Sequence, residues 1–293
     1  MDQADRLRNL METKKVDTPY TFKNRLITVT SGKGGVGKSN FTLNLAISLS
    51  EAGKKVVIVD ADFGMANIEV LYGATPKKSL LNVLKGENNI SDVITEGPGG
   101  ISVISGGSGL TELATLNEKQ VEFLIDTFAF LDTKYDFILI DTGAGASHQV
   151  INMVKASNET IIVTTPEPTA LTDAYTMIKI LKSLENIPDM YIVINRTENK
   201  REGEEIYFKL NRVSHRFLAL DLKLLGYVPN DDMLSKAVRA QKPVLIHSPK
   251  SSFAKAIQAI AKEVLIADNP LAQASSGNES TGFINRFIKM FSK

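Results

Sequence analysis

One glycine-rich segment constrains the fold of this chain more than any other: Gly32-Lys33-Gly34-Gly35-Val36-Gly37-Lys38-Ser39. It matches the pattern G-x-x-x-x-G-K-[ST], a turn that joins a β-strand to an α-helix and surrounds phosphates with backbone N–H groups. An apolar, β-branched run at 26–30 precedes it, and apolar residues at helical spacing follow at 41–49. In such a turn Lys38 reaches the β- and γ-phosphates of a nucleotide, and Ser39 holds Mg²⁺. The pattern predicts a nucleotide-binding strand–turn–helix unit; a chance glycine-rich turn is the alternative.

A second lysine, Lys33, follows directly after the first glycine of this segment. It lies on the outer side of the loop, where its ammonium group is badly placed to reach the nucleotide of its own subunit. It can instead reach a nucleotide that a second subunit binds. Lys33 is therefore the more discriminating feature of this segment.

Composition excludes several classes of protein. The 293 residues are 43% hydrophobic and carry a formal net charge of +1, so we expect an enzyme-sized core and no specific nucleic-acid binding. Cysteine is absent, which excludes disulfides, thiolate zinc sites and iron–sulfur clusters. The charged start of the chain has no secretory signal pattern, and no apolar run has the length of a membrane span. These observations predict a cytoplasmic or peripheral protein.

Apolar runs alternate with amphipathic helical patterns along the chain. The runs are continuous in Val, Ile and Leu, which is typical of parallel strands that helices cover on both faces. We expect strands at 26–30, 55–59, 101–104, 137–140, 160–164, 191–194 and 222–226. We expect helices at 118–131, 169–184, 204–217 and 251–265. The pattern predicts a single doubly wound, mostly parallel α/β sheet over residues 24–267.

Acidic residues follow two of these strands. Asp60 and Asp62 end the strand at 55–59, where the carboxyl edge of a parallel sheet faces a ligand crevice. Asp62 is the candidate for orienting the attacking water, and Asp60 for supporting the water shell of Mg²⁺. A helix or turn cap is the alternative for a terminal aspartate. Asp141 ends the strand at 137–140 and is predicted to bind Mg²⁺ through a water.

Two further turns are candidates for nucleotide contacts. After Asp141, Gly143 lets a backbone N–H group approach the γ-phosphate; a plain strand-to-helix turn is the alternative. Asn195 ends another strand, and its amide offers both a donor and an acceptor to a purine edge; a turn-capping role is equally compatible with the sequence. The three histidines, at 148, 215 and 247, show no ligand spacing.

Together these motifs resemble those of the MinD/ParA group of P-loop ATPases. Lys33 in the glycine-rich segment resembles the deviant Walker A lysine of that group. Asp60-Ala61-Asp62-Phe63-Gly64 with Asn67 resembles its switch I, and Asp141-Thr142-Gly143-Ala144-Gly145 its switch II. The segment 165–169, Asn195 with Arg196, and the loop around Pro229 also resemble it, the last as an adenine-side loop. One departure is Asn40, where many members have Thr; a side-chain contact to the α-phosphate is not expected there, but the backbone of Asn40 can still contact the nucleotide.

The resemblance implies ATP, ADP and Mg²⁺ as ligands and a homodimer that forms when ATP is bound. Lys33 of each subunit completes the other's site, and slow hydrolysis of ATP to ADP and phosphate then releases the subunits. A metal-cluster carrier on the same fold is excluded because the chain has no cysteine.

The first residues resemble one subgroup, the flagellar regulators FlhG (also called YlxH or FleN). The resemblance lies in the segment 2–8 and implies that 1–23 stimulates the GTPase of an FlhF-type partner, with Gln3 reaching its nucleotide site. An unstructured start is the alternative. The other residues implied in this contact are Arg6, Leu7 and Arg8.

The last residues form an amphipathic pattern. Residues 268–282 read as a flexible linker, and 283–293 as a short helix with an apolar stripe flanked by cations, which suits an anionic membrane surface. A helix packed on the core is the alternative. The stripe consists of Phe283, Ile284, Phe287, Ile288 and Phe291.

The resulting hypothesis is an ATP-dependent, dimerising ATPase switch, reversibly bound to the inner face of the cell membrane, that regulates flagellar number or placement. Its expected partners are an FlhF-type GTPase and a flagellar switch (C-ring) component or a transcription regulator. The alternatives are a MinD-type division-site ATPase and a ParA-type DNA or cargo partition ATPase.

Overall fold

The computed structural model describes residues 24–62, 67–107, 118–184 and 188–266. The predicted N-terminal segment, the linker and the C-terminal amphipathic helix lie outside these residues, as does the middle of switch I.

Eight strands of the described chain form one sheet in the order β3-β4-β2-β5-β1-β6-β7-β8. All neighbouring pairs are parallel except β3 and β4, which are antiparallel. The strands are β1 (Arg25–Ser31), β2 (Val56–Ala61), β3 (Ile94–Glu96), β4 (Ser102–Ile104), β5 (Phe137–Ala144), β6 (Glu159–Thr164), β7 (Asp189–Thr197) and β8 (Lys223–Pro229).

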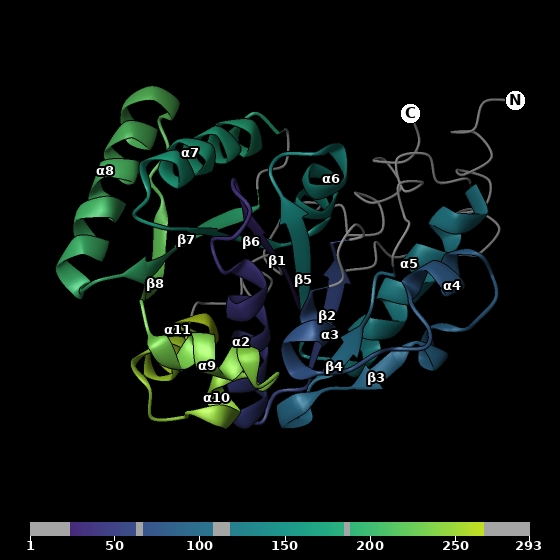
Figure 1. The fold of residues 1–293 in the computed structure, drawn as a ribbon. Helices are drawn as coiled ribbons and strands as arrows, with labels where there is room; N and C mark the ends of the chain where they lie inside the picture. Colours follow the sequence, from purple (N-terminus) through teal and green to yellow (C-terminus); the bar gives the residue numbers. More distant parts are fainter. Residues whose placement is uncertain (1–23, 63–66, 108–117, 185–187, 267–293) are drawn as a thin grey trace, which may run out of the picture.

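Helices cover both faces of the sheet (Figure 1). On one face lie α2 (Lys38–Glu51), α3 (Ile68–Tyr72), α9 (Asp232–Arg239), α10 (Val244–His247) and α11 (Ser252–Ile266). On the other lie α4 (Leu80–Leu84), α5 (Glu118–Lys134), α6 (His148–Ala156), α7 (Pro168–Lys182) and α8 (Lys200–Leu218). Two short 3₁₀ turns, η1 (Ile90–Asp92) and η2 (Pro98–Gly100), flank β3.

The sequence explains this arrangement because successive side chains of a strand point to opposite faces. Ile138 and Ile140 of β5 pack with the α5 layer, whereas Leu139 packs with α2 and α11. Each central strand is buried on both faces, so its apolar run is continuous and does not alternate. The predicted fold class is therefore confirmed.

The predicted strands and helices all occur, with ends shifted by a few residues. The predictions missed the strand β3. It is three residues long, two of them the polar residues Thr95 and Glu96, and it pairs antiparallel with β4.

The chain order reverses at β1, which lies between β5 and β6. A crevice outside the carboxyl ends of the strands is expected at such a point. The ends of β1, β2, β5 and β7 carry the glycine-rich segment and the predicted polar residues, so the topology brings these segments together.

Candidate nucleotide site

The glycine-rich segment leaves β1 at Ser31 and enters α2 at Lys38. Gly35 and Gly37 have φ values of 78° and 92°, a conformation that favours glycine. A Cβ on Gly37 would lie 2.4 Å from Nδ2 of Asn195, so the close approach also requires glycine. The loop therefore folds tightly over the start of α2, where the N–H groups of the first turn have no partners within the helix.

Behind the loop, Lys38 meets the carboxylate of Asp141. Nζ of Lys38 lies 2.9 Å from Oδ1 of Asp141, and Oγ1 of Thr42 donates to the same oxygen at 3.0 Å. Nζ of Lys38 is also 3.5 Å from Oγ of Ser39. Asp141 is fully buried and Lys38 is nearly so, and the two side chains share one desolvated corner with half-buried Ser39 at its edge.

The free oxygen of Asp141 fits a hydrated metal ion. Its Oδ2 is buried without a hydrogen-bond partner, and such oxygens are rarely left unpaired in folded proteins. Within the described residues no three His, Cys, Asp or Glu side chains lie together as a metal-ion site. The unpaired oxygen of Asp141 is compatible with its predicted role of holding Mg²⁺ through a water, and this role and that of Ser39 stay predictions.

Asp60, at the end of β2, binds backbone N–H groups with both of its oxygens. Oδ1 accepts from the N–H of Asp62 at 3.1 Å, and Oδ2 accepts from Asn67 at 2.9 Å and Ile68 at 3.1 Å. The side chain thus caps α3 and ties the switch I segment to the sheet, which agrees with the capping alternative. Its predicted part in the Mg²⁺ water shell stays a prediction.

Burial, together with the nearby Asp141 carboxylate, raises the pKa of Asp60 from 3.8 to about 7, although its backbone hydrogen bonds act in the opposite direction. Between these two values the folded protein holds a proton that the unfolded chain has released, so rising pH favours unfolding.

We expect the free energy of unfolding of the Mg²⁺-free, nucleotide-free protein to fall by roughly 4 kcal/mol between about pH 4 and about pH 7 because of Asp60 alone. Urea unfolding across this range measures the effect as the difference between the wild type and Asp60→Asn, which lacks the titrating group. The exposed Asp232→Asn serves as a control that keeps the wild-type dependence. An Asp60→Asn variant with an unchanged pH profile would contradict the assignment.

Switch I and switch II meet at Asp62. Oδ2 of Asp62 accepts a hydrogen bond from Nδ2 of Asn67 at 3.1 Å, which orients the carboxylate. A Cβ on Gly143 would lie 3.5 Å from Oδ1 of Asp62, so the two switch segments are in contact distance. Asp62 is half-buried, and its predicted role of orienting the attacking water stays a prediction.

Asn195, near the end of β7, contacts the glycine-rich loop. Nδ2 of Asn195 donates to the carbonyl of Val36 at 2.7 Å, and its Oδ1 accepts from the N–H of Arg196 at 2.9 Å. The amide therefore braces the glycine-rich loop and shapes the turn, where exposed Arg196 has a φ of 59°. The predicted purine contacts of Asn195, Arg196 and Pro229 stay predictions.

Comparison with known protein families assigns this chain to a family of P-loop proteins. A family model described as "ParA: NUBPL iron-transfer P-loop NTPase" matches residues 23–265. The chain belongs to the ParA family of P-loop NTPases. Because this ParA-family chain has no cysteine, it carries no thiolate with which to hold an iron–sulfur cluster.

Flagellar proteins are among the relatives of this ParA-family chain. The antiactivator FleN of Pseudomonas aeruginosa is 37% identical over 240 residues, covering 82% of this chain and 86% of FleN. The flagellum site-determining protein YlxH of Helicobacter pylori is 37% identical over 264 residues, covering 89% of each chain. The septum site-determining protein MinD of Pyrococcus horikoshii, solved in complex with Mg-ADP, superposes with a TM-score of 0.69 at 28% identity, covering 87% of this chain and all of that one.

In the glycine-rich loop of this ParA-family chain, the ammonium group of Lys33 lies apart from that of Lys38. Nζ of Lys33 donates to Oε2 of Glu167 at 3.0 Å and to Oγ1 of Thr169 at 2.7 Å, at the start of α7. The side chain of Lys33 is 38% exposed, whereas that of Lys38 is 8% exposed. The two lysines of one loop therefore have different surroundings: Lys38 faces the buried corner, and Lys33 lies at the surface.

Sequence reasoning missed Thr42 and did not give Glu167 or Thr169 a role. Thr42 lies one helical turn after Lys38, a spacing that could have pointed to it, whereas the contact of Lys33 with α7 depends on tertiary structure. The predicted partner-activating and membrane residues all lie outside the described residues. None of the helices in the described ranges has the length and hydropathy of a membrane span.

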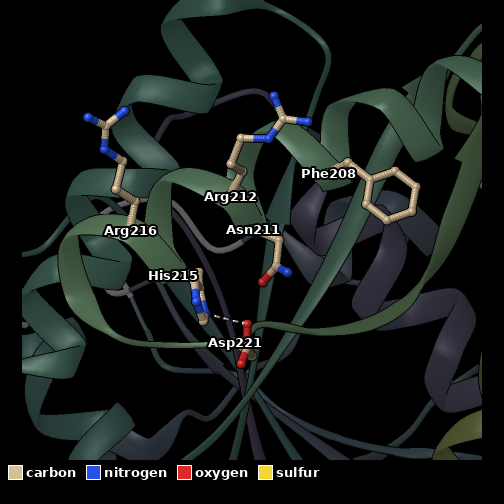
Figure 2. A pocket seen from close by; sticks show the side chains of 6 residues that line it. All are labelled: Phe208, Asn211, Arg212, His215, Arg216 and Asp221. Atoms are coloured by element: carbon tan, nitrogen blue, oxygen red, sulfur yellow. Dashed lines mark hydrogen bonds and ion pairs between the residues drawn. The ribbon is translucent and has the colours of Figure 1, made fainter.

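A second polar surface lies at the far end of α8. Figure 2 shows Phe208, Arg212 and His215 of this helix lining a pocket with Asp221, which precedes β8; His215 Nδ1 and Asp221 Oδ1 are 3.0 Å apart. Since β8 starts at the amino edge of the parallel sheet, this pocket is at the opposite edge from the glycine-rich loop. Phe208 is 59% exposed beside basic side chains, a composition typical of protein-contact surfaces.

Proposed function

We propose that this chain is an ATP-dependent dimerising switch that hydrolyses ATP slowly and regulates flagellar number or placement. The observation that carries the switch is the separation of the two loop lysines. Lys38 is bonded to Asp141 in the buried corner beside Ser39. Lys33 is partly exposed at the surface, where it can contact a nucleotide that a second subunit binds. The flagellar role is supported by the 37% identity to FleN and YlxH over most of the chain.

In this proposal each residue of the site has a defined task. Lys38 and the loop N–H groups bind the β- and γ-phosphates, and Ser39 and Asp141 hold the hydrated metal ion. Asp62, held by Asn67, orients a water in line with the γ-phosphate. Bound Mg²⁺ supplies charge neutralisation on the phosphate oxygens. Closure of the site by Lys33 of a second subunit then makes hydrolysis depend on dimerisation.

The two ends of the chain give this switch its proposed outputs. Residues 1–23 contact an FlhF-type GTPase through Gln3, and 283–293 bind an anionic membrane through the stripe around Phe287. One short amphipathic helix binds membranes weakly, and two linked helices bind far more tightly, so dimerisation raises membrane affinity. ATP occupancy thereby controls where the protein resides.

The flagellar assignment is tested at Gln3. We expect the full chain to accelerate GTP hydrolysis by an FlhF-type GTPase at least about tenfold, because a side chain that orients water stabilises the transition state. A Gln3→Ala variant should lose this acceleration, whereas Asn9→Ala, just outside the segment 2–8, should keep it. The initial rate of phosphate release from GTP is the measurement. If the wild type does not accelerate the partner, the assignment returns to a general MinD-like ATPase.

A further inference from the structure

The contact between Lys33 and α7 has no part in the proposed chemistry, yet it is specific. Two acceptors from a single turn, Oε2 of Glu167 and Oγ1 of Thr169, receive hydrogen bonds from one ammonium group at 3.0 and 2.7 Å. The side chains of Lys33 and Glu167 are 38% and 55% exposed, so solvent and a second subunit can reach the pair.

The backbone around this contact is held in place from both sides. A Cβ on Gly32 would lie 2.3 Å from the backbone carbon of Asp173, so the start of the loop packs directly against α7. Oγ of Ser31 donates to the carbonyl of Lys33 at 3.0 Å, and the N–H of Gly145 in switch II donates to the carbonyl of Ser31 at 2.9 Å. Lys33 therefore reaches Glu167 from a fixed backbone position.

We propose that Glu167 and Thr169 form a holding site that keeps Lys33 within its own subunit and so sets the protein concentration at which the ATP-bound dimer forms. The inference rests on the proposed function, in which Lys33 crosses to the nucleotide of the second subunit. One ammonium group cannot make both sets of contacts fully, so dimerisation breaks the holding contacts. Glu167 acts here as a positioning residue for Lys33.

Symmetry amplifies a weak contact. An exposed ion pair of this kind favours the held state by a small factor, about threefold per lysine. Each dimer releases two lysines, so the two factors multiply to about tenfold in the dimer dissociation constant.

The first test measures dimerisation of the full chain by analytical ultracentrifugation in the presence of Mg²⁺ and a non-hydrolysable ATP analogue. We expect Glu167→Gln to lower the dimer dissociation constant about tenfold, and the added change Thr169→Val to lower it further. Glu205→Gln is the matched control: its side chain is 56% exposed and pairs with Arg201 on α8, so the same charge change should have no effect. A dissociation constant that stays the same or rises in Glu167→Gln overturns the proposal.

The second test needs no dimer. In the nucleotide-free monomer, we expect Lys33 of Glu167→Gln to react faster with an N-hydroxysuccinimide ester than Lys33 of the wild type or of Glu205→Gln, as measured by mass spectrometry of its peptide. Equal labelling of Lys33 in all three proteins overturns the holding site, even if the wild type dimerises. Faster labelling in a protein that never dimerises with ATP would instead leave the contact established and contradict the proposed function.

Discussion

Lys33→Ala is expected to leave a folded, nucleotide-binding monomer that no longer dimerises with ATP. The ammonium group of Lys33 is partly exposed and bonds to the exposed start of α7, so its loss removes little from the folded monomer. In the proposed dimer, each Lys33 makes a charge-assisted contact to a phosphate, and two such contacts are lost. At about 1.5 kcal/mol or more for each, the dimer dissociation constant should rise at least about 100-fold. Analytical ultracentrifugation with a non-hydrolysable ATP analogue measures this change.

Two comparisons separate this effect from simpler ones. The exposed Lys54→Ala carries the same change in charge away from the loop and should dimerise like the wild type. Phe287→Glu should dimerise normally but fail to sediment with anionic liposomes, whereas Lys33→Ala should fail in both assays. A Lys33→Ala protein that dimerises with wild-type affinity would remove the basis for a shared site.

Much of the fold could be predicted because burial on both faces leaves a clear sequence pattern. The runs around Ile58, Leu139 and Val193 contain almost no polar residues, and each forms a strand with a neighbour on both sides. The strand β3 could not be predicted in this way. It is three residues long, lies at the edge of the sheet and is only partly buried, so its pattern carries little information.

In the candidate site, too, part of the arrangement could be predicted from the sequence and part could not. A motif states which residue types lie at the carboxyl ends of β1, β2 and β5, and the topology brings them together. It does not state their partners. That Asp60 caps α3, that Asn195 supports the loop at Val36, and that Lys33 rests on Glu167 depend on tertiary contacts between segments up to 159 residues apart.

Asp62→Ala is expected to abolish ATP turnover while leaving the ATP-bound dimer intact. Asp62 is half-buried, and its carboxylate is held by Asn67 and lies beside Gly143 of switch II; the proposed function assigns to it the water in line with the γ-phosphate. It makes none of the contacts that Lys38 makes with Ser39 and Asp141, so nucleotide affinity should change little. Loss of a group that orients the attacking water should lower the turnover number at least about 100-fold. Phosphate release at saturating ATP measures the rate, and ultracentrifugation measures the dimer.

The neighbouring Asn67→Ala supplies a graded comparison. It removes the hydrogen bond that orients Asp62 but leaves the carboxylate in place, so turnover should fall less than in Asp62→Ala, by about tenfold. Because hydrolysis releases the subunits in the proposed cycle, Asp62→Ala should also remain on anionic liposomes longest after ATP is diluted. Wild-type turnover in Asp62→Ala would assign the water to another residue. Loss of the dimer together with turnover would place Asp62 in the subunit contact, and retention of the dimer without turnover is the result that the geometry of Asp62, Asn67 and Gly143 predicts.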